Sequence, residues 1–296
     1  MTPPLLTSRA PAKVNLTLRV RGRSPQGWHD LVSLVAFAGV GDHLAFVPGP
    51  DLGLEVVGGG EAVAGLPALA ADNLVLRAAH ALDLAVPGLS IGRFVLTKRL
   101  PIAAGLGGGS SDAAAALRLL ARHNGIVLDH PAILRTAQAI GADVTACLKP
   151  LGRYFFGRGD EVSLRIGLPP VPAVLVNPRV PLSTAAVFAA LGLGRGDDGP
   201  SAGLPDPPHR FAAAPALLDW LAGERNDLEA PAAILVPEVA TALAALAATD
   251  GCRLARMSGS GATVFGLYAD RAAAARAARR IRLAHPAWWA VSTVLR

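Results

Sequence analysis

Hydrophobic and polar positions alternate near the start of the chain, between residues 10 and 20. The apolar positions are Ala12, Val14, Leu16, Leu18 and Val20. The positions between them carry charged or polar residues, including Lys13 and Asn15. A period of two predicts a β-strand that is buried on one face.

Further strand and helix patterns follow along the chain. A helix is expected to begin after Asp72, whose side chain can cap it, and to run through Leu82. A second helix should start at Pro131 and stop at Gly141, since proline suits a first turn and glycine an end. Strand-like stretches are residues 43–47, 54–57, 94–98, 152–156, 173–176, 253–257, 263–268 and 289–294. Later helical stretches are residues 213–221, 237–248 and 270–283, the last with a solvated face of arginines.

The order of these elements indicates the fold class. Strands and helices are mixed without a strict alternation of the two, which favours an α+β fold over a doubly wound parallel sheet. We expect a domain boundary between about residues 157 and 171. This gives one domain over residues 1–165 and a second over residues 166–296.

Composition places the chain among globular proteins. Of its 296 residues, 52% are hydrophobic and 17% are charged, which is enough for a sizeable core. Its apolar stretches stay below the roughly 18 uninterrupted residues that a membrane span needs. The first dozen residues contain no apolar core of a secretory signal. We therefore expect a cytoplasmic protein that does not bind membranes.

Charge and cysteine content narrow the functional classes. The net charge is +6, but the arginines are scattered and aromatic residues make up only 5%, so nucleic-acid binding is not expected. An anionic small-molecule substrate accounts for the charge equally well. The two cysteines, Cys147 and Cys252, form neither a metal-binding nor a disulfide pattern. The only lysines are Lys13, Lys98 and Lys149.

A glycine-rich loop passes into an alanine-rich helix after residue 100. Gly105, Gly107, Gly108 and Gly109 remove side chains where main-chain amides can surround an anion. The helix that starts near residues 110–111 adds free N–H groups and the positive end of its dipole. The segment lacks the Gly-Lys-Ser/Thr of a Walker A loop and is not a Rossmann motif. It predicts a phosphate-binding site.

Three segments resemble motifs of the GHMP kinases, the family that includes galactokinase, homoserine kinase and mevalonate kinase. Residues 101–114 are similar to the central ATP-binding motif, residues 10–16 (APAKVNL) to the N-terminal motif, and residues 257–265 (MSGSGATVF) to the C-terminal glycine motif. Residues 141–144 and 226–229 are also typical of the family. The resemblance extends over nearly the whole chain.

This resemblance implies a fold and a reaction. The fold is the two-domain α+β architecture of GHMP kinases, with an N-terminal ATP-binding domain of a ribosomal-protein type, a ferredoxin-like C-terminal domain and the active site in the cleft between them. The loop variant GLGGGSSDAA resembles the branch that acts on a cytidine diphosphate sugar alcohol. It implies phosphorylation of the 2-hydroxyl of that substrate by ATP, with Mg²⁺ as the metal ion. The reaction would be a step of the non-mevalonate route to isoprenoid precursors. The enzyme would be a monomer or a homodimer.

Lys13 and Asp143 match the catalytic positions of the family. Phosphoryl transfer to an alcohol needs positive charge near the phosphoryl group and a group near the acceptor hydroxyl. A lysine stabilises the anionic centre, and a carboxylate accepts the proton or orients the hydroxyl. Asp143 follows a predicted helix end and is expected in a loop. Thr145 stands where the family usually has proline, so the local backbone is less fixed.

The resemblance also implies the residues that bind the sugar alcohol. They are Asn15, Trp28, His29, Lys98 and Phe188. Trp28 and Phe188 would sandwich the cytosine and His29 would read its hydrogen-bonding edge, since aromatic rings offer stacking platforms and imidazole both donates and accepts. The family usually has tyrosine where this chain has Trp28, which keeps the stacking and removes the phenol.

The nucleotide site is expected at two glycine-containing segments. The first comprises Pro101, Ile102, Ala103, Ala104, Gly105, Leu106, Gly107, Gly108, Gly109, Ser110 and Ser111. The second is Gly259, Ser260 and Gly261, either a main-chain nest near the phosphates or a tight hairpin turn. Ser111 is a candidate contact for Mg²⁺.

Three other functions are compatible with parts of the sequence. A kinase for homoserine or a mevalonate derivative would share the glycine-rich loop, but residues 27–29 (GWH) and Asp112 argue against it. A nucleotide-binding regulator without activity is disfavoured because Lys13 and Asp143 are both present. An RNA-binding protein would require salt-dependent affinity for nucleic acid.

Overall fold

A computed structural model of the chain describes residues 5–58, 73–102 and 104–296. The contacts divide the chain into two compact units. Unit 1 comprises Met1–Ala12, Val40–Ile102 and Gly107–Pro150, and unit 2 comprises Lys13–Gly39, Ala103–Leu106 and Leu151–Arg296. Each unit takes segments from several parts of the chain, so the division into residues 1–165 and 166–296 stays a prediction.

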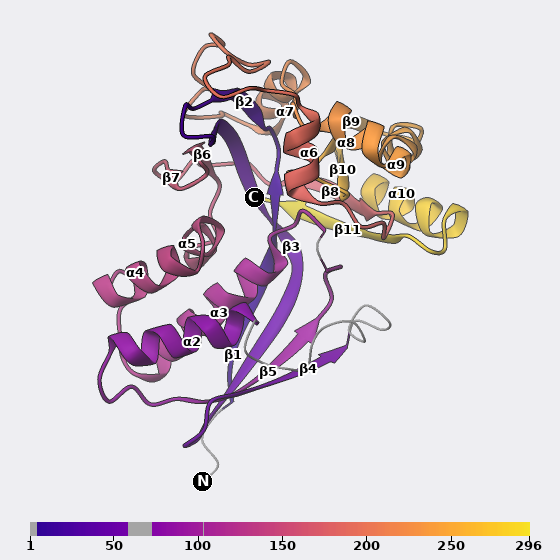
Figure 1. The fold of residues 1–296 in the computed structure, drawn as a ribbon. Helices are drawn as coiled ribbons and strands as arrows, with labels where there is room; N and C mark the ends of the chain where they lie inside the picture. The colour runs from indigo at the N-terminus through magenta and orange to yellow at the C-terminus, as the bar shows by residue number, and fades with distance from the viewer. Residues whose placement is uncertain (1–4, 59–72, 103) are drawn as a thin grey trace. The chain divides into compact units, whose positions relative to one another are not determined.

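The described residues of unit 1 combine strands with four helices. Two strands have residues in both units, β1 (Leu6–Asn15) and β3 (His29–Pro48), and two lie in unit 1 alone, β4 (Gly53–Gly58) and β5 (Gly92–Lys98). β4 pairs with β5 in parallel, and β5 pairs antiparallel with β3. The helices are α2 (Leu74–Ala85), α3 (Gly108–His123), α4 (Pro131–Ile140) and α5 (Ala142–Leu148). Figure 1 shows them gathered on one side of β4 and β5.

Local sequence explains how these helices begin and pack. Asn73 caps α2, because its side chain accepts a hydrogen bond from the N–H of Val75 at 2.9 Å. The expected cap, Asp72, lies outside the described residues, and the helix begins one residue later than predicted. Pro131 occupies the first turn of α4, as predicted. The run Ala113–Ala116 is fully buried in α3, which lets α2 and α5 pack closely against it.

Unit 2 is built on an antiparallel sheet. Its strand order is β11–β8–β10–β9, and β11 also pairs with the β3 residues of this unit, as do β2 and β6. The strands are β2 (Arg19–Arg23), β6 (Arg153–Gly157), β7 (Glu161–Val162), β8 (Val171–Asn177), β9 (Cys252–Met257), β10 (Val264–Tyr268) and β11 (Trp289–Leu295). The helices are α6 (Thr184–Ala190), α7 (Ala214–Ala222), α8 (Glu229–Leu235), α9 (Pro237–Ala247) and α10 (Arg271–Ala284).

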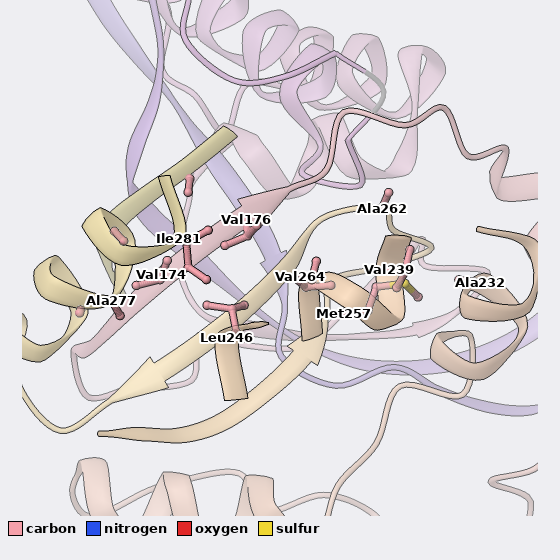
Figure 2. Close-up of a cluster of buried hydrophobic side chains, with 14 of the residues drawn as sticks. Val174, Val176, Ala232, Val239, Leu246, Met257, Ala262, Val264, Ala277 and Ile281 are labelled. Atoms are coloured by element: carbon pink, nitrogen blue, oxygen red, sulfur yellow. The ribbon is translucent and has the colours of Figure 1, made fainter. Parts of the chain in front are cut away.

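The core of unit 2 lies between this sheet and its helices. Figure 2 shows Val174 and Val176 of β8 pointing toward Ile281 of α10, with Val264 of β10 and Leu246 of α9 in the same cluster. Each fully buried side chain of this kind contributes roughly 1.5–3 kcal/mol relative to an exposed one. In α10 the arginines are exposed, and the buried residues are Ala273, Ala274, Ala277, Ala278 and Ile281, so the solvated arginine face is confirmed.

The N-terminal strand differs from its prediction. The alternating segment forms the end of β1 and the start of β2, and every residue from 10 to 20 is buried, including the polar ones. The prediction of one solvent-exposed face is therefore wrong. The polar side chains have partners instead: Asn15 donates to Ser33 at 2.7 Å, and Arg19 donates to Glu224 at 2.7 Å. Hydrogen bonding compensates for their burial.

Two other findings bear on the predictions. Asp143 lies in the first turn of α5 and not in a loop, because Gly141 ends α4 and a new helix begins directly after it.

In the part of the chain that the structure describes, no single helix has the length and apolar character to cross a membrane. The bent pair α8–α9 reaches that length and composition only when its two helices are taken together.

Candidate active site

The glycine-rich loop connects β5 to α3. Gly107 takes the N-cap position of α3 with φ +60°, in the left-handed region that favours glycine. Among the described residues, no side chain caps this helix start. The first main-chain N–H groups of a helix have no partner within it, so they are available to bind an anion. Of the predicted nucleotide-binding residues, Ala103 lies outside the described residues.

The first half of the loop, residues 104–106, packs against the C-terminal glycine motif in unit 2. The N–H of Thr263 donates to the carbonyl of Ala104 at 3.3 Å, and the hydroxyl of Ser258 donates to the carbonyl of Gly105 at 3.3 Å. Gly105 has φ +71°, and a Cβ atom there would lie 2.5 Å from the carbonyl oxygen of Gly261. Only glycine fits so close to another main chain.

The N-terminal motif joins the same contacts. The N–H of Lys13 donates to the carbonyl of Leu106 at 2.9 Å, and the N–H of Asn15 donates to the hydroxyl of Ser258 at 3.1 Å. Three segments separated by up to 243 positions therefore meet through hydrogen bonds. We call this set the motif junction; it comprises Lys13, Asn15, Ala104, Gly105, Leu106, Ser258 and Thr263.

The two predicted catalytic residues lie in different units. The side chain of Lys13 is 7% exposed, and its Nζ lies 5.7 Å from the centroid of the Phe155 ring. Lys13 belongs to unit 2 and Asp143 to unit 1. Their action on one phosphoryl group stays a prediction.

Lys98 lies in a buried cluster of charges in unit 1. Its Nζ donates to Asp42 Oδ2 at 2.5 Å and to Asp112 Oδ2 at 2.9 Å. The exposed fractions are 7% for Lys98, 0% for Asp42 and 3% for Asp112. We call these three residues the ion cluster. The ammonium of this predicted substrate-binding residue thus has two carboxylate partners.

Burial and charge shift the pKa values of Asp112 and Lys98. Burial raises the pKa of the Asp112 carboxyl to about 7; the Lys98 ammonium opposes the rise and the Asp42 carboxylate adds to it. Burial alone would lower the pKa of Lys98, but the carboxylates of Asp112 and Asp42 outweigh it, and that pKa is raised.

Ser111 fits poorly as a metal ligand. Its hydroxyl is fully buried and donates to the carbonyl of Pro11 at 2.9 Å, which ties α3 to β1. Among the described residues there is also no group of three or more His, Cys, Asp or Glu side chains that could hold a metal ion.

The residues predicted to bind the cytosine lie together in unit 2. The rings of His29 and Phe188 have centroids 4.6 Å apart, tilted by 32°. Trp28 is 52% exposed, and the guanidinium of Arg158 lies 3.7 Å from its ring centroid. Partial burial and the guanidinium of Arg23 lower the pKa of His29, which favours the neutral imidazole. Its buried Nε2 has no hydrogen-bond partner in the described part of the chain.

The predicted phosphate nest forms the turn between β9 and β10. The N–H of Gly261 donates to the carbonyl of Ser258 at 3.0 Å, so this amide is used within the turn. Asn226 Nδ2 donates to the carbonyls of Met257 at 2.9 Å and Gly259 at 2.8 Å. The hydroxyls of Ser260 and Thr184 lie 2.8 Å apart. The segment is therefore rigidly held, as a hairpin turn would be.

Sequence reasoning missed two side chains of this site. Asp42 lies inside the long strand β3 between apolar stretches, and neither spacing nor a motif marks it as the partner of Lys98. Arg158 lies in a turn among many arginines. Asp42 could have been identified only by asking which buried acid pairs with Lys98, one of the few lysines of the chain.

Comparisons with known proteins give one consistent result. The model for the GHMP kinases N terminal domain matches residues 73–149, and the model for GHMP kinases C terminal matches residues 210–287. The chain is 58% identical over 294 residues to the 4-diphosphocytidyl-2-C-methyl-D-erythritol kinase of Methylobacterium radiotolerans, with 99% of both chains covered. It is 54% identical over 296 residues to the kinase of the same name from Xanthobacter autotrophicus, again with 99% of both covered.

Solved structures share the fold. A crystal structure of 4-(cytidine 5'-diphospho)-2C-methyl-D-erythritol kinase has a TM-score of 0.78 and 34% identity, covering 98% of this chain and 99% of that one. Homoserine kinase from Cytophaga hutchinsonii has a TM-score of 0.66 at 17% identity, covering 99% and 95%. The second likeness supports the fold alone, and the two-domain α+β prediction is confirmed.

Proposed function

The chain belongs to the GHMP kinases, among the 4-diphosphocytidyl-2-C-methyl-D-erythritol kinases, and from this membership we propose its reaction. The enzyme transfers the γ-phosphoryl group of ATP to the 2-hydroxyl of 4-diphosphocytidyl-2-C-methyl-D-erythritol. The products are the 2-phosphate and ADP. The step belongs to the non-mevalonate route to isoprenoid precursors. A cytoplasmic location and a monomeric or homodimeric state stay predictions.

Lys13 and Asp143 carry the chemistry in this proposal. The 2-hydroxyl oxygen attacks the γ-phosphorus, the bond from that phosphorus to the β–γ bridging oxygen breaks, and the hydroxyl proton leaves. Asp143 accepts that proton or orients the hydroxyl, and Lys13 stabilises negative charge on the transferring group. Since catalysis of phosphoryl transfer is mainly positioning and electrostatics, a precise placement of Lys13 matters most.

The motif junction is the observation that carries the proposal. The N–H of Lys13 is bound to Leu106, in the middle of the glycine-rich loop, at 2.9 Å. The main chain of the proposed catalytic lysine is thereby fixed to the loop proposed to bind the nucleotide. A lysine on a solvent-exposed strand would not need a main-chain hydrogen bond to the glycine-rich loop.

ATP enters as its magnesium complex in this proposal. Mg²⁺ usually keeps several waters and is bound by substrate phosphates with one or two carboxylates, not by a dedicated protein cage. The lack of a three-ligand cluster among the described residues is compatible with that role. The open N-terminus of α3 and the adjacent loop residues, 101–111, would receive the phosphates.

The aromatic group in unit 2 suits the cytosine. Trp28 offers a half-exposed ring, and Phe188 adds a second aromatic surface beside His29. Stacking of a base on an aromatic side chain is worth roughly 1–3 kcal/mol. A neutral His29 with an unpartnered nitrogen can bond the base edge, and Asn15 completes the substrate contacts.

An assay of ADP release tests the function directly. Purified protein with MgATP should release ADP in the presence of 4-diphosphocytidyl-2-C-methyl-D-erythritol and not with homoserine or mevalonate. ADP release with homoserine but not with the cytidylyl substrate would overturn the proposal.

A variant tests the assigned chemistry. Asp143→Asn should lower turnover by roughly 10²–10⁴-fold while ATP binding, measured by calorimetry, persists. The matched control is Asp129→Asn, which changes an exposed aspartate of the same unit that pairs with Lys149. Unchanged turnover in Asp143→Asn would remove Asp143 from the mechanism.

A further inference from the structure

The ion cluster lies directly beside the first turn of α3, and the mechanism above does not use it. We propose that Asp42, Lys98 and Asp112 are positioning residues for ATP, which hold the glycine-rich loop and the start of α3 in the geometry that receives the phosphates. Lys98 on this view does not bind substrate. The inference rests on the proposed function, because it takes the amides at the start of α3 as the nucleotide site.

Asp42 is the anchor of the cluster. Its Oδ1 accepts hydrogen bonds from the main-chain N–H groups of Arg99 at 2.5 Å and Leu100 at 2.9 Å, and its Oδ2 accepts from Lys98. One fully buried carboxylate from β3 therefore fixes the end of β5 and the residues that lead into the loop. Both of its oxygens accept from N–H donors, so a change to an amide places an NH2 group opposite a donor and removes hydrogen bonding at that position.

Lys98 extends this attachment to α3. Its ammonium links Asp42 to Asp112, which lies on the second turn of the helix. A Cβ atom on Gly108 would lie 3.6 Å from Lys98 Nζ and 3.8 Å from Asp42 Oδ2, so the first residue of α3 is in contact with the cluster. Strand β3, strand β5 and the helix start are thus joined at one point.

Charge and burial argue against direct binding of phosphate by Lys98. The ammonium is 7% exposed and lies between two carboxylates. Moving it toward a phosphate would leave both carboxylates buried without their partner, which is strongly unfavourable. One positive charge beside two carboxyl groups also supplies no net attraction for a triphosphate.

The carboxyl groups of Asp42 and Asp112 differ in how many hydrogen bonds they accept. Asp112 Oδ1 has no hydrogen-bond partner in the described part of the chain, so only its Oδ2 contributes to the attachment. An asparagine can supply that single acceptor. We therefore expect Asp112→Asn to be tolerated, and Asp112→Ala and Asp42→Asn not to be.

The test measures ATP affinity and both KM values in wild type, Asp42→Asn, Lys98→Met, Asp112→Asn and Asp112→Ala. Calorimetry with ATP gives Kd, and ADP release gives KM for each substrate. Asp42→Asn and Lys98→Met should raise Kd and KM for ATP on the order of 10- to 100-fold, because small displacements of positioning groups have effects of this size. KM for the cytidylyl substrate should stay within about twofold of wild type. Asp112→Asn should resemble wild type, and Asp112→Ala should not.

The matched control is Glu224→Gln, which disrupts another buried ion pair, with Arg19, in unit 2. It should lower the midpoint of thermal unfolding and leave both KM values unchanged. If the cluster variants likewise lower only the midpoint, the cluster has a structural role alone and the inference is wrong. If Lys98→Met instead raises KM for the cytidylyl substrate, Lys98 is a substrate ligand, which also overturns it.

Two results separate this inference from the proposed function. If Lys98→Met and Asp42→Asn do not fold, the comparison of Asp112→Asn with Asp112→Ala decides, since equal ATP affinity in both contradicts the inference. If wild type releases no ADP with the cytidylyl substrate, the proposed function fails. Calorimetry with ATP alone then still shows whether the cluster sets nucleotide affinity.

Discussion

The two halves of the glycine-rich loop are held in different ways. Residues 104–106 are fixed by main-chain and hydroxyl hydrogen bonds of the motif junction, and Gly105 lies so close to Gly261 that a methyl group does not fit. The start of α3 after Gly107 is held beside the ion cluster, through Asp42, Lys98 and Asp112. One half depends on shape, and the other depends on charge.

This difference has consequences for how each half responds to change. Neutral hydrogen bonds and close packing are insensitive to pH and salt. Residues 104–106 should therefore lose their attachment only when a substitution adds an atom or removes a hydroxyl. A buried cluster of three ionisable groups depends on every member remaining in its charge state. Substitutions that act on one half alone can therefore show whether the two attachments are independent.

The largest loss of stability is expected on the charged side, in Lys98→Met. The change leaves Asp42 and Asp112 buried together without a cation, and breaking a buried ion pair costs about 3–5 kcal/mol. Urea unfolding followed by circular dichroism measures it. Lys149→Met is the control, because that lysine pairs with Asp129 at an exposed site and should change stability little. Equal losses in both variants would contradict the buried role of Lys98.

The next largest effect is expected on the side held by shape, in Gly105→Ala. The new Cβ would lie 2.5 Å from the carbonyl oxygen of Gly261, at φ +71°. Backbone strain and overpacking together should lower the free energy of unfolding by about 2–5 kcal/mol.

A second glycine separates these two contributions. Gly192 has φ +75°, and no described heavy atom lies within 4 Å of a Cβ atom placed there. Gly192→Ala therefore tests the backbone strain without the clash, and we expect a loss of about 1–2 kcal/mol in urea unfolding. A loss as large as that of Gly105→Ala would show that close packing is not the reason for glycine in the loop.

A smaller effect is expected from Ser258→Ala in the motif junction. The change removes a hydroxyl that accepts from the N–H of Asn15 and donates to the carbonyl of Gly105. Leaving these buried main-chain groups without a partner costs about 1–3 kcal/mol. Thermal unfolding measures the change. Ser90→Ala, at an exposed serine, should stay within about 0.5 kcal/mol of wild type, and a similar value for Ser258→Ala would remove Ser258 from the junction.

The sequence predicted the shape-dependent half better than the charged half. Glycines and serines that follow a strand mark a phosphate loop locally, so Gly105 and the turn at Ser258 were found from their own neighbourhoods. The partner of Lys98 is Asp42, 56 positions away in a strand that was predicted only in part. Such a pair is created by tertiary pairing of β3 with β5, and no local pattern encodes it.

Tertiary contacts also explain the two wrong predictions, the exposed face of the N-terminal strand and the loop position of Asp143. Alternation predicted one exposed face for the N-terminal strand, but Asn15 pairs with Ser33, 18 positions away, and Arg19 pairs with Glu224, 205 positions away. Asp143 was placed in a loop because Gly141 signals a helix end. That signal was right for α4, but the short helix α5 that follows it depends on packing against α3 and α4.

The smallest effect near pH 4 is expected from Asp112→Asn, and its pH dependence sharpens the contrast between the two halves. Burial raises the pKa of Asp112 to about 7 from its ordinary value of 3.8. A group whose pKa is raised by folding contributes stability that is fully present at pH below its unfolded value and is lost as pH rises through its folded value. The free energy of unfolding of wild type should therefore decline between about pH 4 and pH 7 through this group.

Asp112→Asn removes that titration and keeps the acceptor for Lys98. Near pH 4 and below, the carboxyl is largely protonated in both the folded and the unfolded protein, so the variant should differ from wild type by no more than about 1 kcal/mol. Between pH 4 and pH 7 the carboxyl ionises in unfolded wild type while it stays protonated in the folded protein, so wild type loses stability that the variant keeps. The variant should therefore become the more stable protein of the two by about pH 7, and the difference should stay constant above that pH. Urea unfolding of both proteins at several values between pH 4.5 and 8 measures the difference.

The Ser258→Ala difference from wild type should stay constant over the same range, because no ionisable side chain takes part in its two hydrogen bonds. A constant difference for Asp112→Asn as well would mean that the charged half of the loop is no more sensitive to pH than the half held by shape.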